Sequence, residues 1–127
     1  MKQIVFVFFL MISIVCFGQD NKQFTLNSEQ YTFYVDEEWD EWHKATNVFI
    51  FNINENGDMQ HFDHFGDKFI YISTSAFKKE KKNGLEFQTK NFIDDEGVPF
   101  TLHLFEDEKL GVQFLYDDGD IIVRYVK

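Results

Sequence analysis

One segment of the sequence has the residue spacing of a calcium-binding loop. Asn52, Asn54, Asn56 and Asp63 place side-chain oxygens around Gly57, as in calcium loops of the EF-hand type. The first position is Asn rather than Asp, the closing residue is Asp rather than Glu, and the flanking residues alternate as strands do. Fewer carboxylates bind a hard cation more weakly, and a tight turn explains Asn56-Gly57 by itself. We therefore favour a plain turn, and calcium binding stays an open alternative.

Histidines near this loop raise the question of a transition-metal site. If the strand residues alternate between faces, His61 and Asp63 share one face and His64 lies on the other. The local set then supplies two ligands, whereas zinc sites use three or four. His43 and His103 are the remaining histidines, and nothing in their spacing places them nearby. We expect no metal and no cofactor, with His64 as a core or rim histidine.

Three acidic segments are the remaining candidates for acid–base chemistry. Residues 94–96, 106–108 and 117–120 could pair carboxylates as a glycosidase does, but such clusters are more often solubilising loop tips. The sequence has no Gly-x-Ser-x-Gly motif and no phosphate-binding glycine loop. Ser73 and Ser75 lie in a plain strand context. We predict that the protein is not an enzyme.

Two groups of residues, tryptophans and lysines, have the composition of an interaction surface. Trp39 and Trp42 lie beside acids, and we favour a lid that closes one end of the core over an exposed binding platform. The lysines cluster in one predicted hairpin, where we favour a solvated tip over a docking finger for an acidic partner. With the last acidic turn added, the possible interaction surface comprises Trp39, Trp42, Lys78, Lys79, Lys81, Lys82, Asp117, Asp118 and Asp120.

The elements that must position these residues are best defined in the middle of the chain. Asn56-Gly57 and Gly66-Asp67 are interpreted as two-residue hairpin loops, the first because type I′ turns favour Asn-Gly. The first loop then places Phe51 opposite Phe62. Because side chains alternate with a period of two, both hairpins give the same aromatic core face. That face comprises Phe49, Phe51, Phe62, His64, Phe69 and Tyr71.

Two more hairpins and one helical segment complete the main predicted elements. Asn83-Gly84 predicts a hairpin that pairs Lys81 with Glu86, and the turn at residues 118–119 predicts one that pairs Phe114 with Val123. Residues 36–44 have acids at the start and tryptophans on one face, which predicts one short helical turn near Trp39. The spacing of turn glycines is typical of an all-β antiparallel meander. Roughly seven or eight strands would form a small barrel or a flattened sandwich.

The N-terminus has the plan of a secretory signal peptide. Lys2 precedes a largely apolar run of 14 residues that ends before Gly18. Cleavage after Gly18 would separate residues 1–18 from a single small β domain, residues 19–127. Cys16 follows Val15 rather than a small residue, so we favour release over lipid anchoring. The protein is expected in the periplasm or outside the cell, with no stable membrane insertion once the signal is removed.

Charge and cysteine content narrow the class of partner. The formal net charge is −10, from 12 basic and 22 acidic residues, and it becomes −11 when Lys2 is removed. Such a chain repels phosphate backbones, so nucleic acid is a poor partner and a basic protein is a better one. The mature chain has no cysteine, which excludes disulfides and thiol catalysis.

The sequence resembles a loose group of short, uncharacterised exported β-rich proteins of Bacteroidetes. The resemblance rests on Trp39-x-x-Trp42, a spacer, the alternating Val48-x-Ile50-x-Asn52 and an Asn/Asp-rich turn. It covers about residues 31–127 and implies a small β fold outside the cytoplasm, with no activity or site residue to transfer.

We expect an exported, non-catalytic binding or interaction protein, and favour a protein partner over a small molecule. Its specific form is an immunity or inhibitor protein whose acidic loops cover a basic partner. The alternative is a calycin-like carrier of a small apolar ligand, which needs an enclosed cavity lined by aromatic residues. One concentrated acidic patch is required for the first form, and a solid core would exclude the carrier.

Overall fold

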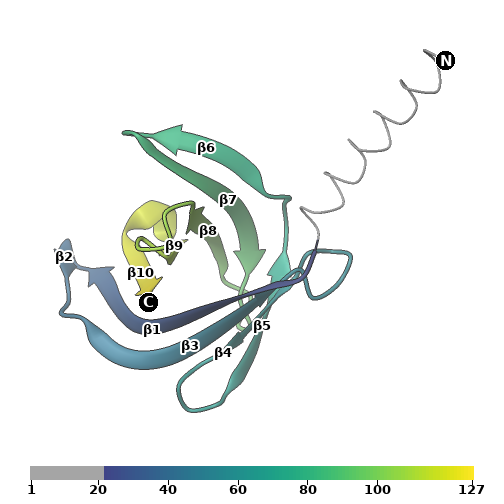
Figure 1. The fold of residues 1–127 in the computed structure, drawn as a ribbon, viewed down its shortest axis with the longest axis horizontal. Coiled ribbons are helices and arrows are strands. Elements are labelled where there is room, and N and C mark those ends of the chain that lie inside the picture. Colours follow the sequence, from purple (N-terminus) through teal and green to yellow (C-terminus); the bar gives the residue numbers. More distant parts are fainter. Residues whose placement is uncertain (1–21) are drawn as a thin grey trace.

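The protein is an all-β barrel in which antiparallel strands follow one another around the molecule (Figure 1). The structure is a computed structural model that describes residues 22–127. The predicted signal peptide and its cleavage site therefore lie outside the described residues. The predicted all-β fold class is confirmed. Of the two architectures left open by the sequence, the chain adopts the barrel.

Eight strands form the barrel wall and two more extend it. The strands are β1 (Phe24–Val35), β2 (Glu38–Trp39), β3 (His43–Phe51), β4 (Met59–Phe62), β5 (Lys68–Ser73), β6 (Lys78–Lys82), β7 (Leu85–Ile93), β8 (Pro99–Phe105), β9 (Val112–Tyr116) and β10 (Ile121–Val126). β10 pairs back with β1, with Tyr125 opposite Tyr31, and this pairing closes the barrel. The short strand β2 pairs only with β1, and β6 pairs only with β7.

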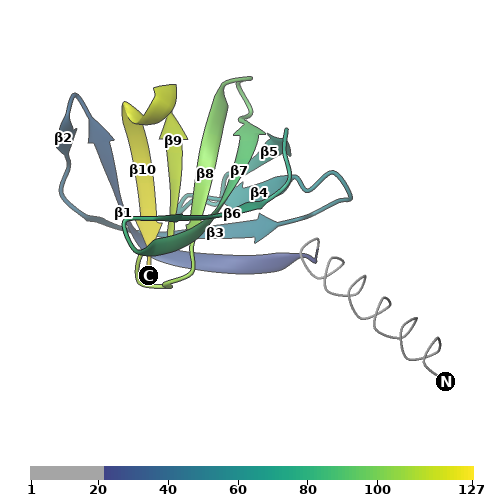
Figure 2. The same ribbon diagram turned by 90° about the horizontal axis from the view of Figure 1, so that it is seen from above.

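Turns alternate between the two ends of the barrel because neighbouring strands run in opposite directions. The β1–β2, β7–β8 and β9–β10 turns lie at one end, which we call the rim end. The β3–β4, β6–β7 and β8–β9 connections lie at the other, the base end. Figure 2 shows β2, the β7–β8 turn and the 3₁₀ turn η1 (Asp117–Gly119) at its upper margin, with the β8–β9 loop and the C-terminus at its lower margin.

Aromatic rings pack against one another in the middle of the barrel. The centroid of Phe49 lies 5.7 Å from that of Phe114 and 4.8 Å from that of Tyr125, and Phe100 stacks on Phe114 at 4.8 Å. These residues come from β3, β8, β9 and β10, so the rings join opposite walls. Each fully buried phenylalanine contributes about 2 kcal/mol of stability. This packing stabilises residues 22–127, which contain no cysteine for a disulfide.

One histidine lies inside this aromatic core. His61 is 5 % exposed and stacks on Phe49 at 4.4 Å. Its Nε2 lies 2.8 Å from Oδ1 of Asn47, and its Nδ1 lies 2.8 Å from the hydroxyl of Tyr71. Because the Asn47 oxygen only accepts, Nε2 donates to it and the Tyr71 hydroxyl donates to Nδ1, which describes a neutral ring. Burial lowers the pKa of His61 to about 4.

The predicted register of the central hairpins is wrong by three residues. Phe62 lies opposite Val48 rather than Phe51, and the β4–β5 pairing is displaced by the same amount. An odd displacement exchanges the two faces of a strand. His61 and Met59 therefore take the core positions predicted for His64 and Phe62. His64 is exposed, and Phe62 is half-buried on the outer face.

The cause of this error is the type of turn. Gly57 donates its N–H to the carbonyl of Asn54, and Gly66 donates to that of Asp63, so each glycine is the last residue of a longer turn. Asn or Asp at the first position and Gly at the fourth are typical of type I turns. Gly57, with φ of 82°, supplies the left-handed residue that ends such a turn. Asn56-Gly57 is therefore not the centre of a type I′ loop.

The helical turn predicted near Trp39 is also wrong. Residues 36 and 37 form a tight turn, and Trp39 lies in β2 opposite Tyr34. Among residues 22–127, helical structure is confined to η1 in the β9–β10 turn. The acids of this segment fit a turn as well as a helix start, and the β1 edge beside them offers strand partners. Pairing with that edge prevails over a short isolated helix, which is marginal in water.

The other two predicted hairpins are confirmed. Lys81 lies opposite Glu86 across the turn at residues 83–84, and Phe114 lies opposite Val123 across the β9–β10 turn. In both cases the predicted loop has the correct centre. When the centre of the loop is correct, each side chain is also assigned to the correct face of its strand.

Candidate protein-binding end of the barrel

The rim end gathers acidic residues that are far apart in the sequence. Three turns meet there because β1 pairs with β10 and because β7, β8 and β9 are consecutive neighbours. Residues 36–42, 94–98 and 117–120 contain no lysine or arginine. These segments hold eleven acids, of which nine lie in the turns and the adjoining β2 and form what we call the acidic rim: Asp36, Glu37, Glu38, Asp94, Asp95, Glu96, Asp117, Asp118 and Asp120.

Local hydrogen bonds fix the backbone of the β7–β8 turn within this rim. Oδ1 of Asp94 accepts the N–H groups of Glu96 and Val98, at 3.0 and 2.8 Å. Oδ2 of Asp94 accepts the hydroxyl of Tyr116 at 3.4 Å, which links this turn to the end of β9. Burial and the nearby Asp94 raise the pKa of Tyr116, so its hydroxyl remains a donor. The carboxylates of this turn are therefore held by an ordered backbone.

Two tryptophans stand exposed beside the acidic rim. Trp39 is 45 % exposed and Trp42 is 49 % exposed, so the predicted lid over the core is wrong. Both indoles have the solvent exposure that the alternative, a binding platform, requires. The two indoles remain on the outside because β2 and the residues after it follow the edge of β1. Val35 at the end of β1 and Val98 in the β7–β8 turn are further exposed apolar residues at the rim end.

Neighbouring side chains hold the indole of Trp39 in place. Its ring lies 5.2 Å from that of Tyr34 and 4.9 Å from the guanidinium of Arg124. Nε and Nη2 of Arg124 donate to Oε1 of Gln113, at 3.2 and 2.9 Å, so the cation itself is anchored. Burial lowers the pKa of Arg124, which remains charged at neutral pH. An indole held in this way gives contact area at a small further entropic cost on binding.

The segment between the two tryptophans is tied to β1. The N–H of Asp40 donates to the carbonyl of Phe33, and the hydroxyl of Thr32 donates to the carbonyl of Asp40 at 2.7 Å. Oδ2 of Asp40 lies 2.8 Å from Nε2 of His43, and this hydrogen bond lowers the pKa of Asp40. The hairpin that carries the tryptophans is thus a defined surface.

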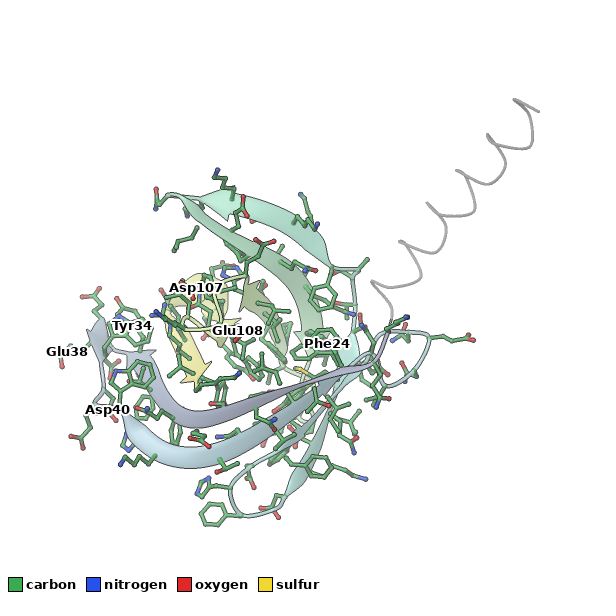
Figure 3. The ribbon with its side chains drawn as sticks, viewed as in Figure 1. Phe24, Tyr34, Glu38, Asp40, Asp107 and Glu108 are labelled. Carbon is green, nitrogen blue, oxygen red and sulfur yellow. The ribbon has the colours of Figure 1, made fainter. Side chains whose placement is uncertain are left out.

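The remaining predicted surface residues lie elsewhere. Lys78, Lys79, Lys81 and Lys82 are exposed along β6, whose turn opens on the base end. The third acidic segment, residues 106–108, is also at the base end. In Figure 3, Glu38 and Asp40 lie at the margin beside Tyr34, whereas Asp107 and Glu108 project near the middle of the outline. The structure therefore brings the predicted tryptophans and Asp117, Asp118 and Asp120 to one end and separates them from the lysines.

Comparisons with protein-family models, curated proteins and solved structures find no match.

The candidate metal ligands either lie far apart or already form hydrogen bonds to other side chains. His61 is in the core with Asn47 and Tyr71, and Asn54 and Asn56 donate their amides to the carboxylate of Asp58, at 2.9 and 2.6 Å. Within residues 22–127, no group of three or more His, Cys, Asp or Glu side chains is arranged to hold a metal ion. In the same part of the chain, no helix is long and apolar enough to cross a membrane.

The common surface formed by the first two turns of the rim was not predicted from the sequence. Residues 36–38 were assigned to a helix, which hid their place in a turn. The signal that could have found the rim is alternation: in a meander, every second turn opens on the same end. Applied to the acid-rich turns, this rule joins residues 36–38, 94–96 and 117–120 and sends residues 106–108 to the opposite end.

Proposed function

We propose that this protein is an exported, non-catalytic binding module whose rim end docks on a basic surface of a protein partner. The observation that carries the proposal is the gathering of nine acids, with no lysine or arginine among them, beside two exposed tryptophans. A dense negative surface accelerates association with a basic surface, and exposed tryptophans are typical anchors of protein interfaces. The acids alone would be compatible with any cationic partner. The exposed indoles favour a protein as that partner.

An immunity or inhibitor role is the specific form of this proposal. Proteins that act on nucleic acids carry basic surfaces, because they must attract phosphate backbones. A barrel end that presents many carboxylates competes for such a surface. Export of the chain, as the N-terminal sequence predicts, would place the encounter in the periplasm or outside the cell.

The test begins with cross-linking of the mature protein in periplasmic and secreted fractions, followed by purification of the captured partner and calorimetric titration. The rim variant Asp117→Asn/Asp118→Asn/Asp120→Asn should weaken binding about 10-fold or more, because charge complementarity is lost. Trp39→Ala should weaken it by a similar factor, about 10-fold, if the indole is an anchor. Raising the salt concentration should weaken the wild-type complex more than the rim variant.

The matched control changes the same number of charges at the base end. Glu55→Gln/Asp107→Asn/Glu108→Gln should bind within about 2-fold of wild type, because these residues lie beyond screening range of a partner on the rim. Equal losses in the two triple variants would contradict a rim-specific interface. A captured partner with an acidic surface would contradict the proposal as a whole.

A calycin-like carrier is the second candidate, favoured by the closed eight-stranded barrel itself. The rings of Phe49, Phe114 and Tyr125 occupy the middle of that barrel, so an apolar ligand would have to displace them. Titration with a fluorescent fatty acid distinguishes the candidates. Saturable binding that changes in Phe114→Ala would support a carrier, and no binding in either protein would leave the rim-end interface.

A further inference from the structure

A second feature of the molecule is a polar cleft at the side of the barrel, away from the acidic rim. It has a volume of about 620 Å³ and lies between the β3–β4 loop, the β5–β6 connection, β6 and β7. Asn56 and Ser73 join two of its walls, because the Asn56 amide donates to the Ser73 carbonyl at 3.2 Å. Figure 1 shows the β3–β4 loop and the β5–β6 connection at the same side of the barrel. Phe77 and Lys79 contribute the apolar and basic parts of the lining.

A buried lysine forms the floor of this cleft. Lys90 is 4 % exposed, and its Nζ donates to the carbonyl of Gly57 at 2.8 Å. Nζ also lies 4.7 Å from the ring centroid of Phe77 and 5.3 Å from that of Phe92. An ammonium group has three donors, so one donor has an oxygen acceptor and the others face aromatic rings or the cleft.

The positive charge of Lys90 has no carboxylate at salt-bridge distance within residues 22–127. The nearest acid that affects it is Asp58, whose carboxylate accepts hydrogen bonds from Asn54, Asn56 and the N–H of Ser73. Burial raises the pKa of Asp58, but these bonds outweigh burial and lower it overall. Burial lowers the pKa of Lys90, and Asp58 offsets this only in part. Removing an unpaired ammonium from water is unfavourable, and an anion beside it offsets that cost.

We propose that the Lys90 cleft binds a small organic oxyanion, a molecule with one carboxylate or phosphate group. The oxyanion takes the free donors of Lys90, and the rest of the molecule lies against Phe77 and the β5–β6 connection. Lys79 and Glu55 both line the cleft and carry opposite charges that offset one another, so the buried ammonium of Lys90 supplies the attraction for an anion. A volume of about 620 Å³ is within the range of small-molecule sites. This site is independent of the rim-end interface and holds whether or not that interface exists.

Nuclear magnetic resonance on the wild-type protein tests the site directly. Inorganic phosphate and butyrate are titrated in separate arms at constant ionic strength, with sodium chloride as the reference salt. We expect saturable shifts of the Lys90 ε-methylene and of the Gly57 and Ser73 amides, with a Kd of about 1 mM or tighter for one arm. The anion with the lower Kd shows whether the site prefers a phosphate or a carboxylate group. No saturable shift up to about 50 mM of either anion would overturn the proposal.

Two lysine variants separate the site from general charge. Lys90→Met keeps the length of the side chain and removes its charge, so it should abolish the saturable shifts. Lys82→Met makes the same charge change at an exposed position of β6 outside the cleft, and it should bind as wild type does. Lys90→Met should unfold at a temperature no lower than wild type, because the buried charge is removed. Saturable shifts that persist in Lys90→Met would show binding elsewhere and overturn the assignment.

Discussion

At the scale of single residues, His61 links the stability of the barrel to pH. Its ring is neutral between Asn47 and Tyr71, and burial lowers its pKa to about 4, below the ordinary value of 6.5. As the pH falls, the unfolded chain therefore takes up a proton before the folded chain does. The stability that depends on a neutral His61 is complete above pH 6.5 and is lost as the pH falls from 6.5 to about 4.

This difference in pKa predicts an acid-dependent loss of stability. Between neutral pH and about pH 4, the free energy of unfolding should fall by about 3 kcal/mol through His61. Denaturant melts at several pH values measure it. His61→Gln keeps a side chain that can hydrogen-bond to Asn47 and should flatten the profile in this window. Asp58 has a lowered pKa, so its own contribution is lost at lower pH. A profile that is equally steep in His61→Gln would contradict the assignment to His61.

Gly111 is the residue at which a side chain is least tolerable. It is buried with φ of 68°, and a Cβ there would overlap the carbonyl oxygen of Tyr125. Gly111→Ala should therefore lower the unfolding free energy by about 3 kcal/mol or more, from strain and from displacement of β10. Gly66→Ala is the matched control. It also has positive φ, but its Cβ would meet no atom within 4 Å, so its loss should be limited to about 1 kcal/mol. Equal losses in the two variants would show that the positive φ, and not the overlap with Tyr125, determines the loss of stability.

At the scale of elements, the β1–β2 hairpin carries backbone strain that a substitution can relieve. Asp36 and Glu37 have φ of 55° and 65°, and Glu is a poor residue for this conformation. Replacing the pair by Asn-Gly should raise the unfolding free energy by about 1 kcal/mol. Thermal unfolding measures the gain. The variant Asp36→Ala/Glu37→Ala should instead lose stability, because alanine is also unfavourable at positive φ. A gain in stability in this variant would refute the turn assignment.

The hairpins show what the sequence can determine about these elements. Asn83-Gly84 and the β9–β10 turn were placed correctly, and each predicted pair followed, because the loop centre determines every partner. The predicted register in β4 failed because Asn56-Gly57 is compatible with two turn types, and Asn54 was interpreted as a possible calcium ligand and not as the first residue of a type I turn. Trp39 was misplaced because its acids fit either a helix start or a turn, and only the neighbouring edge of β1 decides between them.

The composition of the candidate site was partly predictable, but its geometry was not. Trp39 and Asp118 were both named from their residue types, yet their common position depends on β1 pairing with β10, a contact between the two extremes of the described chain. The cleft at Lys90 gave no signal, because the sequence does not tell a buried lysine from the exposed lysines of β6. Burial of that residue comes from the fold around it.

At the scale of the whole molecule, charge is distributed unevenly. The turns of the acidic rim contain no lysine or arginine, whereas the exposed lysines of β6 lie toward the base end. Like charges at the rim repel one another, and dissolved salt weakens that repulsion. Raising sodium chloride from about 20 mM to about 500 mM should stabilise the wild-type protein by about 1 kcal/mol.

The two triple variants make this salt prediction specific. The rim variant at residues 117, 118 and 120 should lose about half of the salt-dependent gain, because its remaining acids repel less. The base-end variant at residues 55, 107 and 108 should keep most of it. Denaturant melts at the two salt concentrations give the comparison. The same salt response in both variants would indicate that repulsion is spread over the whole surface.

Closure of the barrel by β1 and β10 has a consequence for the order of folding. The hydroxyl of Ser28 in β1 donates to the carbonyl of Val126, a contact that spans 98 positions of the chain. Hairpins such as β6–β7 can form early, since their partners are a few residues apart, but β1 has an unpaired edge until β10 arrives. During synthesis, β1 emerges before the other strands and therefore waits longest for its last partner. The interval before closure is when this protein is most exposed to aggregation and to proteases.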